Sequence, residues 1–413
     1  GTSGGDDFHH LPSARAGSIA GLSSGTRSSV PNRSACPDGF LFASSLFHHH
    51  MQLEPWQLDL QRCVRTVEEL ERYVDIPDRH RMRDALANMR LSITPHTLRL
   101  INFEDPQDPI LLMSVPQERE LSFSPEELVD PIGDDIKSPV PFLTHRYPDR
   151  VLVYATFFCS LFCRFCFRRS KTGEATPGPT KADQDRIIAY LVSHPQVEEV
   201  ILTGGDPLTL LDFQIEDWLS RIRQVSSVRR IRFHTRTLVN LPARVTEALV
   251  RVFRRHMDET HPIFLVTHFN HPREIALENI VAVAKLIDAG IVVRNQSVLL
   301  KGINDDPVVL EELFKALTDI RVVPYYLHQL DLAQGTNHFR VPIEQGIKLM
   351  RTLQGRVTGI ALPRYMLDIP GGNGKIPLAH AYARREGDAW VVESPFGERV
   401  AYCEPQCGWD PRG

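Results

Sequence analysis

The sequence lacks long apolar runs and has no large excess of charge of one sign. No stretch of about 18 consecutive apolar residues occurs, so it predicts no membrane-spanning helix and no membrane partner. The net charge of −4 gives no indication of a nucleic-acid partner or of an acidic membrane surface. Of the 413 residues, 42% are hydrophobic and 24% are charged, which is typical of a soluble globular protein.

Cysteine is also scarce, and its distribution does not suit a disulfide framework. The seven cysteines stand at positions 36, 63, 159, 163, 166, 403 and 407. Three of them fall within eight residues and the other four are scattered, so the odd total favours a metal site in a reducing compartment. We therefore expect a cytoplasmic protein. No role is indicated for Cys36, Cys63, Cys403 or Cys407.

The N-terminal third divides into two segments of different composition. Residues 1–50 are rich in Gly, Ser, Arg and His and have no apolar period, so we expect a disordered or non-native segment. Residues 51–142 are expected to form a helical extension followed by a Pro- and Asp-rich connector. Within the extension, TVEE from Thr66 is typical of a capping box that begins a helix reaching about Val74. A second amphipathic stretch covers Met82–Met89.

Residues 143–380 alternate between apolar, strand-like runs and helical patterns. Candidate strands lie at residues 151–156, 199–203, 230–235, 263–268, 291–296 and 322–328. Their nearly continuous apolar character is typical of parallel strands that helices cover on both faces. Six such units predict an α/β fold, a partial (β/α)6 barrel with an N-terminal helical extension, and the chemistry of such a barrel lies at the carboxyl ends of its strands. Residues 381–413 are expected to be a C-terminal tail.

The three clustered cysteines follow the first candidate strand with the spacing C-x3-C-x2-C. Cys159, Cys163 and Cys166 can bind three irons of a cubane iron–sulfur cluster and leave the fourth iron without a protein ligand. An open iron can be chelated by the amino and carboxylate groups of a bound molecule. A zinc site, which would need a fourth ligand, and a chance cluster of buried cysteines are the alternatives.

A lysine on a glycine-rich loop stands near the end of the barrel segment. The sequence LDIPGGNGKIPL contains Asp368 and Lys375, separated by the glycines of residues 371–374. A lysine on such a flexible loop can reach the aldehyde of a cofactor and form an imine. A surface loop or a phosphate-binding loop is the alternative, although the residue order of a P-loop is absent.

The cysteine loop, with Phe165 before its third cysteine, resembles the radical S-adenosylmethionine (SAM) superfamily. The resemblance implies a [4Fe–4S] cluster bound by Cys159, Cys163 and Cys166, reductive cleavage of SAM to a 5′-deoxyadenosyl radical, and an electron donor of flavodoxin or ferredoxin type. It also implies a glycine-rich contact with SAM after the second strand, where LTGGDPL stands at residues 202–208. Gly204 and Gly205, followed by Asp206, would let the backbone approach the methionine moiety. An ordinary strand-to-helix turn is the alternative.

Several further segments resemble the lysine 2,3-aminomutase family in order and spacing. They are LTHRYPDRVL, CSLFCRFCFRR, GGDPL, THFNH, NQSVLLKGIND, PYYLHQLDLAQGTNHFR and LDIPGGNGKIP. The resemblance runs from about Trp56 to about Pro377. It implies a pyridoxal phosphate (PLP)-dependent isomerase that converts a basic L-α-amino acid, with L-lysine as first choice, to its β-amino acid. A homo-oligomer is also expected.

The resemblance assigns roles to individual residues. Lys375 is implied to bind PLP as an imine, with Arg146 and Tyr147 next to the cofactor and the arginine suited to its phosphate. Arg168 is implied to bind the substrate α-carboxylate, because a planar guanidinium can donate two parallel hydrogen bonds. Asn295 and Gln296 are implied to line the SAM site. Arg146 in a surface ion pair is the alternative interpretation.

Asp331 and Asp368 are implied to hold the side-chain ammonium of lysine. A pair of carboxylates facing a pocket is costly unless a cation neutralises it, so the pair favours a basic substrate over glutamate. Arginine is the competing substrate, because its guanidinium also matches two carboxylates. Arg364 and Tyr365 differ from the smaller or apolar residues usual in the family, which leaves the length of the pocket open. Both aspartates could instead be loop caps.

Two departures and two rival functions complete the expectations. Clostridial lysine enzymes hold a zinc with one cysteine after NQSVLL and with a cysteine cluster at the C-terminus. Here Asp306 stands at the first position and the tail has only Cys403 and Cys407, so no such zinc is expected. A β-lysine-forming enzyme that serves modification of elongation factor P would share the reaction. A non-catalytic iron–sulfur protein would explain the cysteines but not Lys375, Arg168 and the aspartate pair.

Overall fold

The computed structural model describes residues 53–172, 176–387 and 389–403. The expectation for residues 1–50, together with Cys36 and Cys407, therefore lies outside the described residues. None of the helices in the described part of the chain has the length and apolar composition that a membrane crossing requires.

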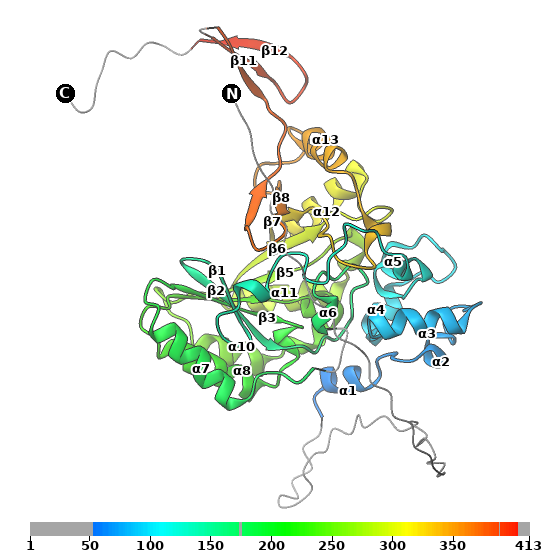
Figure 1. Cartoon of the computed structure of the whole chain (residues 1–413), viewed down its shortest axis with the longest axis vertical. Helices are drawn as coiled ribbons and strands as arrows, with labels where there is room; N and C mark the ends of the chain where they lie inside the picture. The colour runs from blue at the N-terminus through cyan, green and yellow to red at the C-terminus, as the bar shows by residue number, and fades with distance from the viewer. Residues whose placement is uncertain (1–52, 173–175, 388, 404–413) are drawn as a thin grey trace, which may run out of the picture. The chain divides into compact units, whose positions relative to one another are not determined.

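A nine-stranded sheet whose spatial order follows the chain order forms the centre of the fold (Figure 1). The strands are β1 (Leu143–Tyr147), β2 (Arg150–Thr156), β3 (Glu199–Gly204), β4 (Arg230–His234), β5 (Ile263–Thr267), β6 (Val292–Val298), β7 (Val323–His328), β8 (Arg364–Asp368) and β9 (Lys375–Pro377). Strands β2 to β8 are parallel, while β1 and β9 pair antiparallel with β2 and β8. All six predicted strands are present, with ends within two residues of the prediction. The α/β barrel type is therefore confirmed, and β8 adds a seventh parallel strand.

Helices cover the sheet where parallel strands need crossover connections. They are α6 (Arg169–Thr172), α7 (Lys181–Val192), α8 (Asp212–Arg223), α9 (Thr237–Asn240), α10 (Glu247–Arg255), α11 (Leu277–Asp288), α12 (Pro307–Asp319) and α13 (Ile343–Leu353). Figure 1 shows α7, α8 and α10 grouped along one face of the sheet. Fully buried strand residues such as Val200 and Ile231 share one core with Ile187 of α7 and Leu219 of α8. This core fixes the strand ends on which the site residues stand.

The N-terminal extension contains α1 (Pro55–Gln61), α2 (Val67–Leu70), α3 (Arg79–Asn88), α4 (Pro95–Leu100) and α5 (Pro109–Ser114). The predicted capping box at Thr66 and Glu69 is present. The helix ends at Leu70 rather than near Val74, because the next residues close i→i+3 turns such as Tyr73 N–H to Leu70 O, which is a common way for a helix to end.

Segments for which the sequence predicted no regular structure also form strands. Beyond β9, β10 (Ala383–Glu386), β11 (Ala389–Glu393) and β12 (Arg399–Tyr402) make a separate antiparallel sheet. The expected tail thus contains three strands in its described part. The residues of β10 and β12 are exposed and those of β11 only partly buried, so no alternation of buried and exposed positions indicated these strands.

Candidate active site

The three clustered cysteines lie on the loop between β2 and α6, at the carboxyl end of the first parallel strand. Burial raises the pKa of the Cys159 thiol well above its ordinary value, and Asp206, Cys166 and Cys163 raise it further. Within the described residues, no three His, Cys, Asp or Glu side chains converge to hold a single metal ion. Three thiols on one loop can each bind a separate iron of a cluster. The donor set therefore fits a cubane cluster with one open iron.

The cysteine loop is anchored to the N-terminal extension through buried charges. Arg164 donates two hydrogen bonds to the Glu120 carboxylate, from Nε at 2.8 Å and from Nη2 at 2.6 Å. Arg169 Nη2 reaches the same carboxylate at 2.6 Å. Arg164 also donates to the carbonyls of Met89 and Arg90. The loop is therefore fixed by charge-assisted hydrogen bonds inside the protein.

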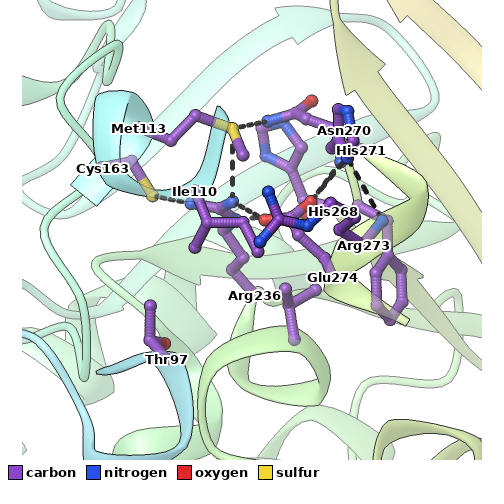
Figure 2. Close-up of polar contacts among 12 residues, drawn as sticks. Thr97, Ile110, Met113, Cys163, Arg236, His268, Asn270, His271, Arg273 and Glu274 are labelled. Carbon is purple, nitrogen blue, oxygen red and sulfur yellow. Dashed lines mark hydrogen bonds and ion pairs between the residues drawn. The ribbon is translucent and has the colours of Figure 1, made fainter. Parts of the chain in front are cut away.

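Arg236, which follows β4, contacts the cysteine loop directly (Figure 2). Its Nη1 donates to Cys163 Sγ at 2.8 Å, and its Nε donates to the carbonyl of His268 at 3.1 Å. Its Nη2 forms an ion pair with Glu274, whose carboxylate also accepts the Asn270 N–H at 2.6 Å. The guanidinium is thus held rigidly, and its remaining donor points at one of the expected cluster ligands. Sequence analysis missed this residue because nothing in its local pattern distinguishes it.

The glycines after β3 allow this loop to approach the backbone before the cysteines. A Cβ on Gly204 would lie 2.2 Å from Thr156 O, and one on Gly205 would lie 2.3 Å from Phe158 O. Neither position tolerates a side chain without a backbone shift. The glycines therefore allow two segments of the chain to pack closely, while their predicted contact with the methionine moiety of SAM stays a prediction.

Asp206 joins the β3 and β4 loops. Its carboxylate accepts hydrogen bonds from the Thr235 hydroxyl at 2.7 Å and from the backbone N–H groups of Leu208, Arg236 and Thr237. Burial raises the pKa of Asp206 although these bonds oppose the rise. In this arrangement the side chain positions the backbone of both loops.

Lys375 begins β9 and lies opposite Asp368 of β8. Its Nζ is 3.3 Å from Asp368 Oδ1 and 5.5 Å from the centre of the Tyr326 ring. Its backbone N–H donates to the Tyr147 hydroxyl at 3.0 Å. Tyr147, which lies in β1, therefore fixes the backbone from which the lysine projects. The antiparallel turn through residues 371–374 brings Lys375 back to the end of the sheet.

Asp368 is shared by a lysine and a histidine. His328, at the end of β7, contacts Asp368 Oδ2 through Nδ1 at 3.2 Å, and both side chains are buried. Burial alone would raise the pKa of Asp368, but the hydrogen bond from His328 and the charge of Lys375 hold it below its ordinary value. His328 belongs to the same HQLD sequence as Asp331, yet its contact with Asp368 was not predicted, because it depends on the pairing of β7 with β8.

Asp331 lies just beyond β7, and the charges of Lys375 and Arg168 compensate it only in part. No side-chain hydrogen bond or ion pair to Asp331 is formed by the residues that the structure describes. Burial, together with the charge of Asp368, raises the pKa of Asp331 to about 8. The two predicted aspartates are thus close enough to interact electrostatically, and among the described residues only Asp368 forms a direct ion pair with a lysine.

Arg146 and Arg168 meet at a carboxylate that the sequence analysis did not single out. Arg146 Nη2 contacts Asp134 Oδ1 at 2.8 Å, and Arg168 Nε contacts Asp134 Oδ2 at 3.1 Å. Arg168 Nη1 also donates to the Thr203 hydroxyl at 3.3 Å. The Nε of Arg146 is buried and has no hydrogen-bond partner among the described residues, as would suit an arginine that awaits an anionic ligand.

Asn295 and Gln296 occupy adjacent positions in β6, where its pairing with β7 is irregular. Asn295 is buried and its amide bonds the N–H and the carbonyl of Phe269 at 2.7 and 3.1 Å, which ties β6 to the end of β5. Gln296 pairs with Tyr326 in the sheet and therefore shares the face of the ring beside Lys375.

Two positions noted as departures from the family pattern have structural roles. Tyr365 is buried and its hydroxyl hydrogen bonds to Gln329, so its ring occupies the core rather than lengthening a pocket. Asp306 is the N-cap of α12, with its carboxylate accepting the Val308 N–H at 2.7 Å. Neither side chain contacts Asp331, Asp368 or Lys375 within the described residues.

Comparison with known proteins identifies the family to which the cysteine loop belongs. Residues 153–314 match the Radical SAM superfamily, the class of enzymes that use a [4Fe–4S] cluster and SAM, and the cysteine loop lies at the start of the matched region. The chain is 39% identical over 353 residues to L-lysine 2,3-aminomutase of Clostridium subterminale, which covers 85% of this chain and 84% of that protein. The chain belongs to the lysine 2,3-aminomutase family, a family of isomerases.

Other relatives show the range of this family. L-lysine 2,3-aminomutase of Methanococcus maripaludis is 40% identical over 357 residues, covering 85% of this chain and 81% of that protein. Glutamate 2,3-aminomutase of Clostridioides difficile is 36% identical over 353 residues, covering 85% and 82%. The family therefore includes proteins named for a basic and for an acidic amino acid, and the substrate has to be argued from the site.

Proposed function

We propose that the protein is a PLP-dependent radical aminomutase that converts L-lysine to β-lysine. The observation that carries the proposal is the pair of neighbouring carboxylates, Asp331 and Asp368, of which only Asp368 forms an ion pair with Lys375 among the described residues. Burial and the charge of Asp368 raise the pKa of Asp331 to about 8, which is the direction expected where a negative charge is costly because it is only partly compensated. An ammonium group beside Asp331 would remove that cost, whereas a second acidic group would increase it.

Arg168 supplies a binding group for the other end of an amino acid. Its Nε and Nη1 are engaged with Asp134 and Thr203, and its Nη2 forms no hydrogen bond with the described residues. These free donors suit a carboxylate. A substrate held by its ammonium at Asp331 and Asp368 and by its carboxylate at Arg168 would be fixed at both ends, which orients its α and β carbons.

Lys375 and Arg146 are the residues that would hold PLP. The amine of Lys375 would bind the cofactor aldehyde, and the unpartnered Nε of Arg146 would donate to the phosphate. Tyr147 would keep the lysine backbone in place through its bond to the Lys375 N–H. When bound, the cluster and SAM supply a radical that abstracts hydrogen, and PLP supplies a π system that stabilises an unpaired electron during amino migration.

Asp368 would change its partner as the site fills. In the ligand-free protein it neutralises the Lys375 ammonium. A substrate ammonium beside Asp368 would take over this neutralising role, which would leave the Lys375 amine for the cofactor. His328 would hold the other carboxylate oxygen throughout, which keeps Asp368 in the same orientation.

Comparison of four amino acids tests this assignment. Iron-reconstituted protein would be incubated without oxygen with dithionite, SAM, PLP and either lysine, arginine, ornithine or glutamate, and the β isomers quantified by mass spectrometry. We expect the highest kcat/KM for lysine, with arginine as the competitor because its guanidinium also matches two carboxylates. Preferential formation of β-glutamate would refute the role of the aspartate pair. The electron donor and the homo-oligomer stay predictions.

A further inference from the structure

Asp134 connects the two arginines that the proposed function assigns to different ligands. Each of its carboxylate oxygens takes one guanidinium, Oδ1 that of Arg146 and Oδ2 that of Arg168. The Asp134 side chain is 2% exposed, and those of Arg146 and Arg168 are 9% and 11% exposed. Because the three groups are buried together, the bridge is shielded from solvent and strongly constrains the geometry of both arginines.

The charges around Asp134 leave a net positive site. One carboxylate compensates only one of the two guanidinium groups, and Lys171 lies close enough to lower the pKa of Asp134 as well. Both arginines keep donors that the described residues do not use, namely Nε of Arg146 and Nη2 of Arg168. A buried site with an excess positive charge and free donors on two sides suits two anionic groups held at a fixed separation.

The backbone that carries Asp134 is itself fixed. The Asp130 carboxylate accepts the backbone N–H groups of Asp134 and Asp135 at 2.9 and 2.8 Å, and the Ser138 hydroxyl donates to the Asp134 carbonyl at 2.7 Å. The preceding Gly133 packs tightly against the lysine loop, because a Cβ there would lie 2.4 Å from the Gly372 nitrogen. The same short segment therefore contacts the loop of Lys375 and orients both arginines.

We propose that Asp134 is a positioning residue that couples the cofactor-phosphate site at Arg146 to the substrate-carboxylate site at Arg168. The inference rests on the proposed function, which assigns PLP phosphate and the α-carboxylate to these arginines. Without the bridging carboxylate, two like charges face each other in a buried site and separate. Both anionic groups then lose their aligned donors at the same time.

The test compares Asp134→Asn with Asp135→Asn in iron-reconstituted protein. Asp135 is the matched control, because it is the next residue, is exposed and pairs only with Lys171. Equilibrium dialysis gives the Kd for PLP, and steady-state assays give KM and kcat for lysine. We expect Asp134→Asn to raise both the Kd for PLP and the KM for lysine by about tenfold or more, as misplaced binding groups do. Asp135→Asn should change neither constant.

Pyridoxal, which lacks the phosphate, distinguishes positioning from general damage. Asp134→Asn should weaken PLP binding but leave pyridoxal binding unchanged, whereas a distorted fold would weaken both. Asp134→Glu keeps the charge and should restore part of the loss; it also serves as the test variant if Asp134→Asn does not fold. A change in only one of the two constants, or in neither, would overturn the coupling. Wild-type protein that takes up no PLP would instead refute the proposed function, and this inference with it.

Discussion

The carboxyl group of Asp331 is held where an isolated charge is costly. Its pKa in the folded protein is about 8, whereas an unfolded aspartate has a pKa of about 3.9. The folded state therefore binds the proton more tightly, and stability is lost as the pH rises from about 4 to about 8. Asparagine has the same shape but cannot ionise. Asp331→Asn should therefore raise the melting temperature of the ligand-free protein at about pH 8 and change it little near pH 4.

The same substitution should impair the reaction, because the substrate ammonium loses a charged partner. We expect kcat/KM for lysine to fall by about a hundredfold or more. Thermal denaturation at the two pH values and the kinetic assay check both statements. A melting temperature that is unchanged at about pH 8 would contradict the electrostatic part, and undiminished kcat/KM would contradict the binding role.

Arg236 places a positive charge 2.8 Å from Cys163 Sγ. Hydrogen bonds and charges at the sulfur ligands help to set the potential of an iron–sulfur cluster, and a cation stabilises the reduced, more negative form. Arg236→Gln should shift the midpoint potential to more negative values by an amount equivalent to about a tenfold change in the one-electron equilibrium, or about 59 mV. A redox titration followed by electron paramagnetic resonance measures the shift.

Arg273→Gln is the control for Arg236→Gln. Arg273 is partly exposed and pairs with Asp108, and it makes no contact with the cysteines among the described residues. Arg236→Lys keeps the charge and should therefore shift the midpoint potential less than Arg236→Gln does. Equal shifts in the Arg236→Gln and Arg273→Gln variants would mean that the contact with Cys163 does not set the potential.

Site residues can be predicted from the sequence when the residues that act together lie close together along the chain. Cys159, Cys163 and Cys166 carry their spacing in eight residues, so a cluster site can be inferred from them directly. Lys375 and Asp368 come together through a short antiparallel turn that the glycines indicate. The role of Asp134 depends on arginines that are 12 and 34 residues away along the chain, and no local pattern in the Asp-rich connector distinguishes Asp134 from its neighbours.

At the scale of elements, the loop after β3 and the loop that carries the cysteines are in close backbone contact. The Gly205 N–H donates to Thr156 O at 2.6 Å, and a Cβ at Gly205 would meet Phe158 O at 2.3 Å. Gly205→Ala should lower the free energy of unfolding by about 1–3 kcal/mol, the usual cost of overpacking, and should reduce iron incorporation. Denaturant unfolding and iron analysis measure the two effects.

Gly359→Ala is the matched control, since a Cβ there meets nothing within 4 Å. It should leave both stability and iron content close to those of the wild type. If Gly205→Ala behaves like Gly359→Ala, the two loops are not constrained by this contact.

Elements with a strong periodic pattern were predicted, and short or exposed ones were not. The six central strands combine apolar runs with intervening helical patterns, which determine both their type and their ends. Strand β9 has three residues and depends on pairing with β8, while the residues of β10 and β12 are exposed. A strand that is buried on one face has alternating apolar and polar residues. Strands without such a buried face lack this pattern and cannot be predicted from it.

At the scale of the whole molecule, the N-terminal extension supports the cysteine loop from outside the barrel. The Ser92 hydroxyl donates to Ser160 O at 2.9 Å, and Leu161 is buried in the hydrophobic cluster of the extension. Together with the buried pair of Arg164 and Glu120, these contacts join segments that are far apart in the sequence. The sequence indicated a helical extension, but its role as a support could only be found from the contacts.

The central claim is that one chain combines a radical site with a lysine-binding, PLP-dependent isomerase site. The most direct test is to incubate iron-reconstituted protein with dithionite and L-lysine, with SAM and PLP each present or omitted, and to measure β-lysine and 5′-deoxyadenosine by mass spectrometry. The account predicts β-lysine only when both SAM and PLP are present, and none from Lys375→Ala. Formation of 5′-deoxyadenosine without β-lysine in the complete mixture would contradict it.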